Sequence, residues 1–105
     1  MRELSQPARD DIDLSNVLFA LADPVRRLLI ARLAEGGECG TTQCAGEDMA
    51  ASTASHHFKV LREAGVTSTR RDGTRRLVSL RRADLDSRFP GLLDVILDAD
   101  DASAS

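Results

Sequence analysis

The sequence predicts a small, mainly α-helical domain that carries one β-hairpin. Apolar residues recur at helical spacing in several segments of the 105-residue chain. Asp72-Gly73 separates two short segments, 66–71 and 75–80, and is a strong hairpin signal because a type I′ turn needs positive φ at both central residues. No apolar run is long enough to span a membrane, and no charged-then-apolar leader opens the chain. We therefore expect one cytoplasmic domain with no membrane partner.

Two helices open the predicted domain. The first follows the capping residue Asp13, and its apolar positions at i, i+3, i+4 and i+7 are Leu14, Val17, Leu18 and Leu21. The second begins at Asp23-Pro24, because aspartate suits the N-cap and proline suits the first helical turn. Its expected core face consists of Val25, Leu28, Leu29 and Leu33, and its expected solvated side chains are Arg26, Arg27 and Arg32.

Further helices flank the hairpin. Glycines and threonines between 38 and 51 allow only a short, marginal third helix. A fourth helix from Ser52 should bury Ala54, Phe58 and Leu61, and a last helix from Pro90 is apolar over more than one face. The order α-α-α-α-β-β-α is that of a winged helix-turn-helix. We expect a flexible N-terminal arm over 1–10, one DNA-binding and dimerisation domain over 11–98, and a disordered acidic tail over 99–105.

Positive charge gathers in the fourth helix and the hairpin. Residues 52–82 contain eight basic and two acidic side chains, a net charge of +6, although the whole chain carries −3. One basic face on an acidic protein is typical of a nucleic-acid reader. Two alternatives are a solvated surface and a face that binds an acidic protein partner. An enzyme is not expected, because the sequence has neither a phosphate-binding glycine loop nor a credible nucleophile–base pair.

Three motifs carry a resemblance to a known family. They are L-A-D-P-V-R-R-L-L-I, S-T-A-S-H-H-F-K-V-L-R-E-A-G-V and R-R-D-G-T-R-R-L-V-S-L. Over roughly residues 14–97 the chain resembles the ArsR/SmtB family of bacterial transcriptional repressors. The resemblance implies a homodimer that binds an inverted-repeat operator in double-stranded DNA.

The fourth helix should enter the major groove, where base edges are distinguishable. Its candidate base or nearby phosphate contacts are Ser52, Thr53, Ser55 and His56. An alternative stays open in which Ser52 only caps the helix and Thr53 only fills its first turn. The candidate phosphate contacts on the helix are Lys59 and Arg62. The hairpin would lie along the DNA backbone or reach into the adjacent minor groove through Arg70, Arg71, Thr74, Arg75 and Arg76, although some of these arginines will be merely solvated. His57 is expected to be a partly buried structural residue and not a metal ligand.

The resemblance also implies a dimer interface made by the first and last helices. The candidate interface residues are Leu14, Val17, Leu18, Leu92, Leu93 and Ile96. The alternative is that these residues complete the core of a single protomer.

Relatives in the resembled family commonly release DNA when a metal or metalloid binds. The last helix offers Asp94 and Asp98 without any histidine, so a ligand site there is expected to be absent or altered. Cys39 and Cys44 are the remaining candidate ligands, but two thiolates alone do not close a metal site. Inert thiols, a thiol redox switch and a transition metal or metalloid effector therefore stay open, and no cofactor is certain.

Overall fold

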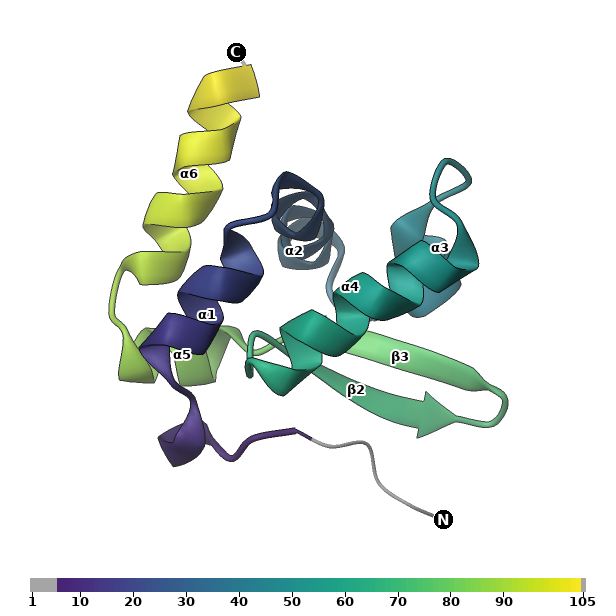
Figure 1. The fold of residues 1–105 in the computed structure, drawn as a ribbon, viewed down its shortest axis with the longest axis horizontal. Helices are drawn as coiled ribbons and strands as arrows, with labels where there is room; N and C mark the ends of the chain where they lie inside the picture. The colour runs from purple at the N-terminus through teal and green to yellow at the C-terminus, as the bar shows by residue number, and fades with distance from the viewer. Residues whose placement is uncertain (1–5, 105) are drawn as a thin grey trace.

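The computed structural model describes residues 6–104, with side chains described through residue 99. Its elements are η1 (Arg9–Asp11), α1 (Leu14–Leu21), α2 (Pro24–Gly36), β1 (Cys39–Gly40), α3 (Thr41–Ala45), α4 (Ala51–Glu63), β2 (Thr67–Asp72), β3 (Arg75–Leu80), α5 (Arg82–Arg88) and α6 (Leu92–Ala104) (Figure 1). The predicted winged helix-turn-helix is confirmed. Three elements were not predicted: η1, the two-residue strand β1 and the helix α5. The last helix begins at Leu92 and not at Pro90, because Gly91 has a φ of +85° and breaks the helical path.

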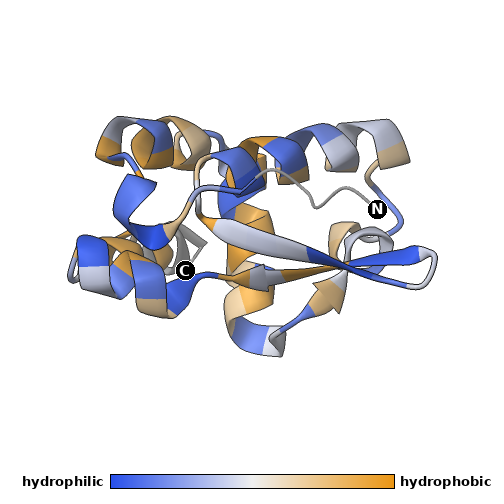
Figure 2. Ribbon diagram, turned by 90° about the horizontal axis from the view of Figure 1, so that it is seen from below, coloured by the Kyte–Doolittle hydropathy of each residue, from blue (hydrophilic) through white to orange (hydrophobic). Residues whose placement is uncertain are grey.

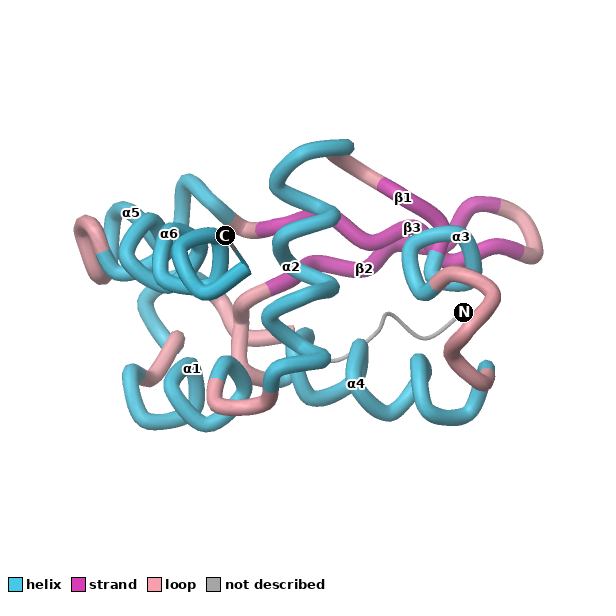
Figure 3. The backbone as a smooth tube through the Cα atoms, turned by 90° about the horizontal axis from the view of Figure 1, so that it is seen from above, coloured by secondary structure: helices cyan, strands magenta, loops and turns pink. Residues whose placement is uncertain are grey.

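The hairpin and the last two helices lie at opposite ends of the molecule. Helix α2 crosses the middle, with the strands on one side of it and α1 and α4 on the other (Figure 3). The sheet is antiparallel with the strand order β1-β3-β2, so β2 forms one edge. This arrangement projects the hairpin beside α4.

Aspartates begin the first two helices, as predicted. Asp13 accepts a hydrogen bond from the backbone N–H of Asn16 at 3.1 Å. Asp23 accepts from the backbone N–H of Val25 at 2.7 Å and of Arg26 at 3.3 Å. These bonds satisfy amide groups that have no partner within the helix.

The buried face of α2 differs from the prediction. Leu29 and Leu33 are buried as expected, but Val25 and Leu28 are 36% and 47% exposed. The observed face follows i, i+3, i+4 and i+7 from a different start, and its members are Arg26, Leu29, Ile30 and Leu33. The expectation that Arg26 is solvated was wrong, because the folded chain supplies hydrogen-bond acceptors for its guanidinium.

The hairpin turn lies one residue later than predicted. Asp72 pairs with Arg75, so Gly73 and Thr74 form the two-residue loop. Gly73 has a φ of +63°. Within the described chain only glycines have a positive φ, so Thr74 does not. Positive φ at only the first loop position is the pattern of a type II′ turn, not of the expected type I′ turn. Strand β2 accordingly runs over Thr67–Asp72.

Gln6 and Pro7 contact the domain, and the last helix reaches the end of the described chain. The Gln6 side-chain amide donates to the carbonyl oxygen of Thr69 at 3.1 Å and accepts from its N–H at 2.8 Å. Arg81 Nη1 donates to the carbonyl oxygen of Pro7 at 2.7 Å. These contacts hold Gln6 and Pro7 against the domain, and residues 1–5 of the expected flexible arm lie outside the described chain. Helix α6 continues to Ala104 where a disordered tail was expected, and residue 105 also lies outside it.

The core lies between the helices and the inner face of the sheet, and the outer half of the hairpin is hydrophilic (Figure 2). Its largest fully buried side chains include Ile12, Leu29, Ile30 and Leu61. Within residues 6–104, no helix combines the length and apolar character needed to cross a lipid bilayer.

Candidate nucleic-acid interface

Helix α4 separates a buried face from an exposed polar face. Ala54, Phe58 and Leu61 are 4%, 2% and 0% exposed, as predicted, and anchor the helix to the core. The exposed face presents the candidate DNA contacts Ser52, Thr53, Ser55, His56 and Lys59, with Arg62 partly buried beside them. One helix face thus offers hydroxyl groups, an imidazole and two cations.

The first turn of α4 has no side-chain cap. The helix begins at Ala51, and the preceding Ala50 offers no capping oxygen. The alternative in which Ser52 caps the helix is therefore wrong, because Ser52 is already the second helical residue. The first N–H groups of α4 point out of the helix end without helical partners, and such groups favour an anion.

The strand register divides the hairpin arginines between two faces. Arg71 pairs with Arg76 on the face that also holds the inward-facing pair Thr69 and Val78. Because side chains alternate along a strand, Arg70 and Arg75 lie on the other face. Each of those two has an acidic partner: Arg70 donates twice to Glu38, at 2.9 and 2.8 Å, and Arg75 lies 3.7 Å from Asp72.

Three arginines of α4 and the hairpin lie near one another. Arg71 and Arg76 are exposed and stand directly opposite each other in the hairpin, an arrangement that is destabilising for like charges. Burial lowers the pKa of Arg62, and the neighbouring charge of Arg76 lowers it further. We call Arg62, Arg71 and Arg76 the arginine cluster. It is a concentration of positive charge that an anion would relieve.

Two other basic residues of the segment 52–82 form ion pairs away from the arginine cluster. Arg81 is largely buried and donates to Asp84 at 3.0 Å. Arg82 lies 3.7 Å from Asp86 and also donates to Asp94 of α6. The net charge of residues 52–82 therefore overstates the charge that this face presents to a ligand.

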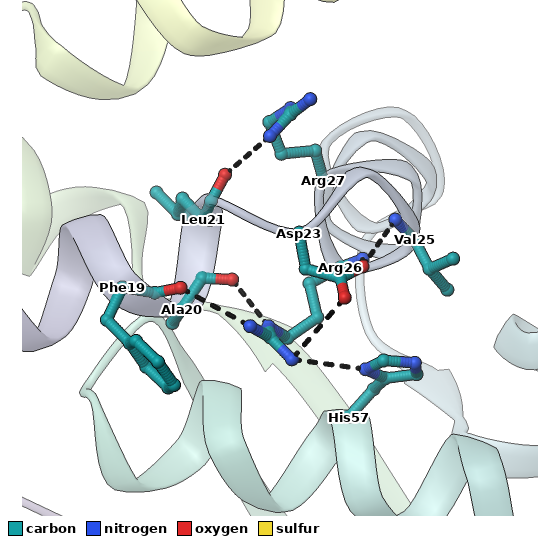
Figure 4. A network of polar contacts seen from close by, with 8 residues as sticks. All are labelled: Phe19, Ala20, Leu21, Asp23, Val25, Arg26, Arg27 and His57. Carbon is teal, nitrogen blue, oxygen red and sulfur yellow. Dashed lines mark hydrogen bonds and ion pairs between the residues drawn. The ribbon is translucent and has the colours of Figure 1, made fainter.

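His57 lies beneath the exposed polar face of α4 and has the structural role that the sequence predicted. It is 8% exposed, and its Nδ1 lies 3.4 Å from Arg26 Nη1 (Figure 4). Sequence reasoning missed Arg26 as a contributor to this site. Its position three residues after the Asp23 cap was the only local signal, because the acceptors for its guanidinium come from α1 and α4.

The two cysteines lie near each other at β1 and α3. Burial, and then the neighbouring Cys39, raise the pKa of the Cys44 thiol to about 11, so Cys44 is protonated at neutral pH. Among the side chains described, no three His, Cys, Asp or Glu residues gather in a way that would hold a metal ion. Cys39 and Cys44 do not form a closed metal site within this part of the chain.

Both α1 and α6 carry exposed apolar side chains, which we call the apolar surface on α1 and α6. Leu14, Leu18 and Val95 are 44%, 47% and 66% exposed. Leu92 and Ile96 are partly buried against the core. The assignment of Val17 and Leu93 to a partner interface is corrected, because they are 1% and 2% exposed and already lie in the core of the protomer.

The fold, together with the basic face formed by α4 and the hairpin, defines a winged helix-turn-helix DNA-binding protein. The family model of the bacterial regulatory protein, arsR family, matches residues 23–69. The HTH-type transcriptional regulator YceK of Bacillus subtilis (strain 168) is 38% identical over 92 residues, which cover 83% of this chain and 89% of that protein. The chain belongs to the arsR family of bacterial regulatory proteins; it is a transcriptional regulator and not an enzyme.

Solved structures agree with this fold. The ArsR family transcriptional regulator RHA00566 superposes with a TM-score of 0.65 at 24% identity, covering 86% of this chain and 91% of that one. The transcriptional repressor BigR from Xylella fastidiosa superposes with a TM-score of 0.58 at 28% identity, covering 79% of this chain and 97% of that one.

Proposed function

We propose that the protein is a homodimeric repressor in which two α4 helices read an inverted-repeat operator. The observation that carries the DNA geometry is the arginine cluster, which stands on the same side of the hairpin as α4. With α4 in the major groove, this placement directs Arg71 and Arg76 toward the adjacent phosphates. The uncapped start of α4 supports the same orientation, because its free N–H groups suit a phosphate oxygen.

Residue roles follow from this docking. Ser52, Thr53, Ser55 and His56 project from the exposed N-terminal half of α4 and would meet base edges or nearby phosphates. Lys59 and the arginine cluster would hold the register on the backbone. Arg70 and Arg75 would contribute less, because each already has an acidic partner on the other face of the hairpin.

The DNA-binding test uses a duplex that the wild-type protein selects from a randomised library. Its affinity is then measured against salt concentration for two double variants of equal charge change. Arg71→Ala/Arg76→Ala should reduce the slope of log affinity against log salt by about 2 per protomer, since each lost phosphate contact contributes roughly 0.9. Arg70→Ala/Arg75→Ala is the matched control and should change the slope by less than half as much.

Two outcomes would contradict this proposal. Equal slopes for the two double variants would remove the arginine cluster from the interface. Failure of the wild-type protein to select any sequence, with binding to acidic proteins instead, would favour the protein-interaction alternative.

The dimer would form through the apolar surface on α1 and α6. Exposed leucine and valine side chains there would be removed from water by a second copy of the same surface. Two reading helices would then lie about 34 Å apart, one turn of the duplex.

Sedimentation equilibrium of two variants tests the dimer. Leu18→Asp should give monomers, because the introduced carboxylate would be buried without a partner. Val25→Asp is the control, since Figure 4 shows Val25 on the side of α2 away from α1, and it should leave the assembly unchanged. A dimer that withstands Leu18→Asp would place the interface elsewhere.

A further inference from the structure

Arg26 lies at the junction of three helices. It belongs to α2 and is only 8% exposed. Its Nε donates to the carbonyl oxygen of Ala20 at 2.6 Å, and its Nη2 donates to that of Phe19 at 3.3 Å (Figure 4). Both acceptors are in the last turn of α1, where a cation is favoured.

The same guanidinium reaches the reading helix. Nη1 lies 3.4 Å from Nδ1 of His57 in α4 and 3.8 Å from Oδ2 of Asp23. Because a guanidinium has donors only, this contact requires Nδ1 of His57 to accept and places the imidazole proton on Nε2. The side chain therefore joins the end of α1, the start of α2 and the middle of α4.

The apolar contacts of α4 define its rotation about its own axis less sharply than the Arg26–His57 contact does. Phe58 and Leu61 bury its inner face, but apolar packing is non-directional. The Arg26–His57 contact is directional, and its strength depends on the orientation of α4 about its own axis. His57 is bracketed by His56 and Phe58, so a rotation that moves His57 also moves the candidate base contact His56.

We propose that Arg26 is a positioning residue for base reading, acting through His57 to fix the orientation in which α4 presents its exposed face. Arg26 itself does not contact DNA. This inference rests on the proposed function, because it needs a protein that discriminates between DNA sequences. It predicts that loss of the Arg26–His57 contact reduces sequence discrimination while general attraction to phosphates persists.

The test compares affinity for the selected duplex with affinity for a scrambled duplex of equal length. Arg26→Gln should lower this ratio by about tenfold, because misalignment of one base contact has an effect of that order. Its salt dependence on the scrambled duplex should match that of the wild type, since the phosphate contacts are retained. A residue that only stabilised the fold would lower the unfolding temperature and leave the ratio unchanged.

Arg27→Gln is the matched control. Arg27 also donates to a carbonyl at the end of α1, that of Leu21 at 2.8 Å, and Figure 4 shows it directed away from His57. This variant should keep the wild-type ratio. An equal loss of discrimination in both variants would overturn the proposal.

His57→Phe completes the test. It removes the acceptor and keeps an aromatic ring, so it should lower the ratio as Arg26→Gln does, and the double variant should lower it little further. Additive losses would show that Arg26 does not act through His57. If Arg26→Gln does not fold, His57→Phe decides alone: a lowered ratio supports the proposal and an unchanged ratio overturns it. A wild-type protein that selects no sequence would instead refute the proposed function.

Discussion

Replacement of Gly65 by alanine should destabilise the protein strongly, for two separable reasons. Gly65 follows α4 with a φ of +84°, a conformation that costs an L-residue about 1–2 kcal/mol. A Cβ added there would lie 2.7 Å from Ile12 Cγ1 and 3.1 Å from Pro7 Cγ. Ile12 is only 1% exposed and cannot turn into solvent, so overpacking adds about 1–3 kcal/mol. The expected loss in the free energy of unfolding is therefore about 2–5 kcal/mol.

Gly91→Ala isolates the conformational part of this loss. Gly91 has nearly the same φ, +85°, but apart from its chain neighbours no atom of the described residues lies within 4 Å of its added Cβ. It should therefore lose only about 1–2 kcal/mol. The difference between the two variants measures the clash with the N-terminal segment.

Urea unfolding followed by circular dichroism gives both values, provided that all variants are compared at one protomer concentration. A double-mutant cycle with Ile12→Ala should recover part of the Gly65→Ala loss, because the smaller side chain admits the new methyl group. Losses for Gly65→Ala and Gly91→Ala that agree within about 0.5 kcal/mol would refute the packing of Ile12 and Pro7 against Gly65.

Three further predictions concern a hydroxyl, a carboxylate and a thiol. The Thr67 hydroxyl is buried and has no hydrogen-bond partner among the described residues, so Thr67→Val should raise the free energy of unfolding by about 1 kcal/mol, and a measured loss would mean that the hydroxyl is satisfied. Burial acts to raise the pKa of Asp23, but two backbone N–H groups and the Arg26 guanidinium outweigh it and hold that pKa below 3.8. The stability contributed by the Asp23 carboxylate should be present above about pH 4 and decline below it; Asp23→Asn keeps a capping oxygen and should show a weaker decline in acid unfolding. Burial is the largest cause of the raised pKa of Cys44, and it remains in a Cys39→Ser variant although the contribution of Cys39 is lost. Alkylation of that variant should therefore be slow at about pH 8 and accelerate as the pH rises, and rapid labelling at the lower pH would contradict the burial of the Cys44 thiol.

Local signals in the sequence were sufficient for the starts of α1 and α2 and for the two faces of α4. Asp13 and Asp23 cap their helices through contacts with residues two and three positions away, so no tertiary information is needed. Ala54 and Phe58 lie on the core side because helical spacing alone places them there.

Local sequence signals did not predict which hairpin arginines share a face. The expected turn centred on Asp72-Gly73 would have placed Arg71 opposite Thr74. The observed turn begins one residue later and places Arg71 opposite Arg76. A shift of one residue changes every cross-strand pair, and turn type is a weak signal between two polar segments.

Arg26 and the apolar residues of α1 show a second limit. Helical spacing identifies which residues share a face, but not what that face meets. Val17 meets the core of its own protomer and Leu18 does not, although both are apolar residues of one helix. Burial of Arg26 depended on acceptors from α1 and α4, which only the folded chain brings together.

The pairing of Gln6 with Thr69 has a consequence for the solubility of the protein. Strand β2 is the outer strand, and its outward backbone groups at Thr69 would otherwise be open to a strand from another molecule. The glutamine amide occupies one donor and one acceptor there, as a neighbouring backbone would. A chain shortened past Gln6 would expose these two backbone groups, and we expect it to be more prone to edge-to-edge association.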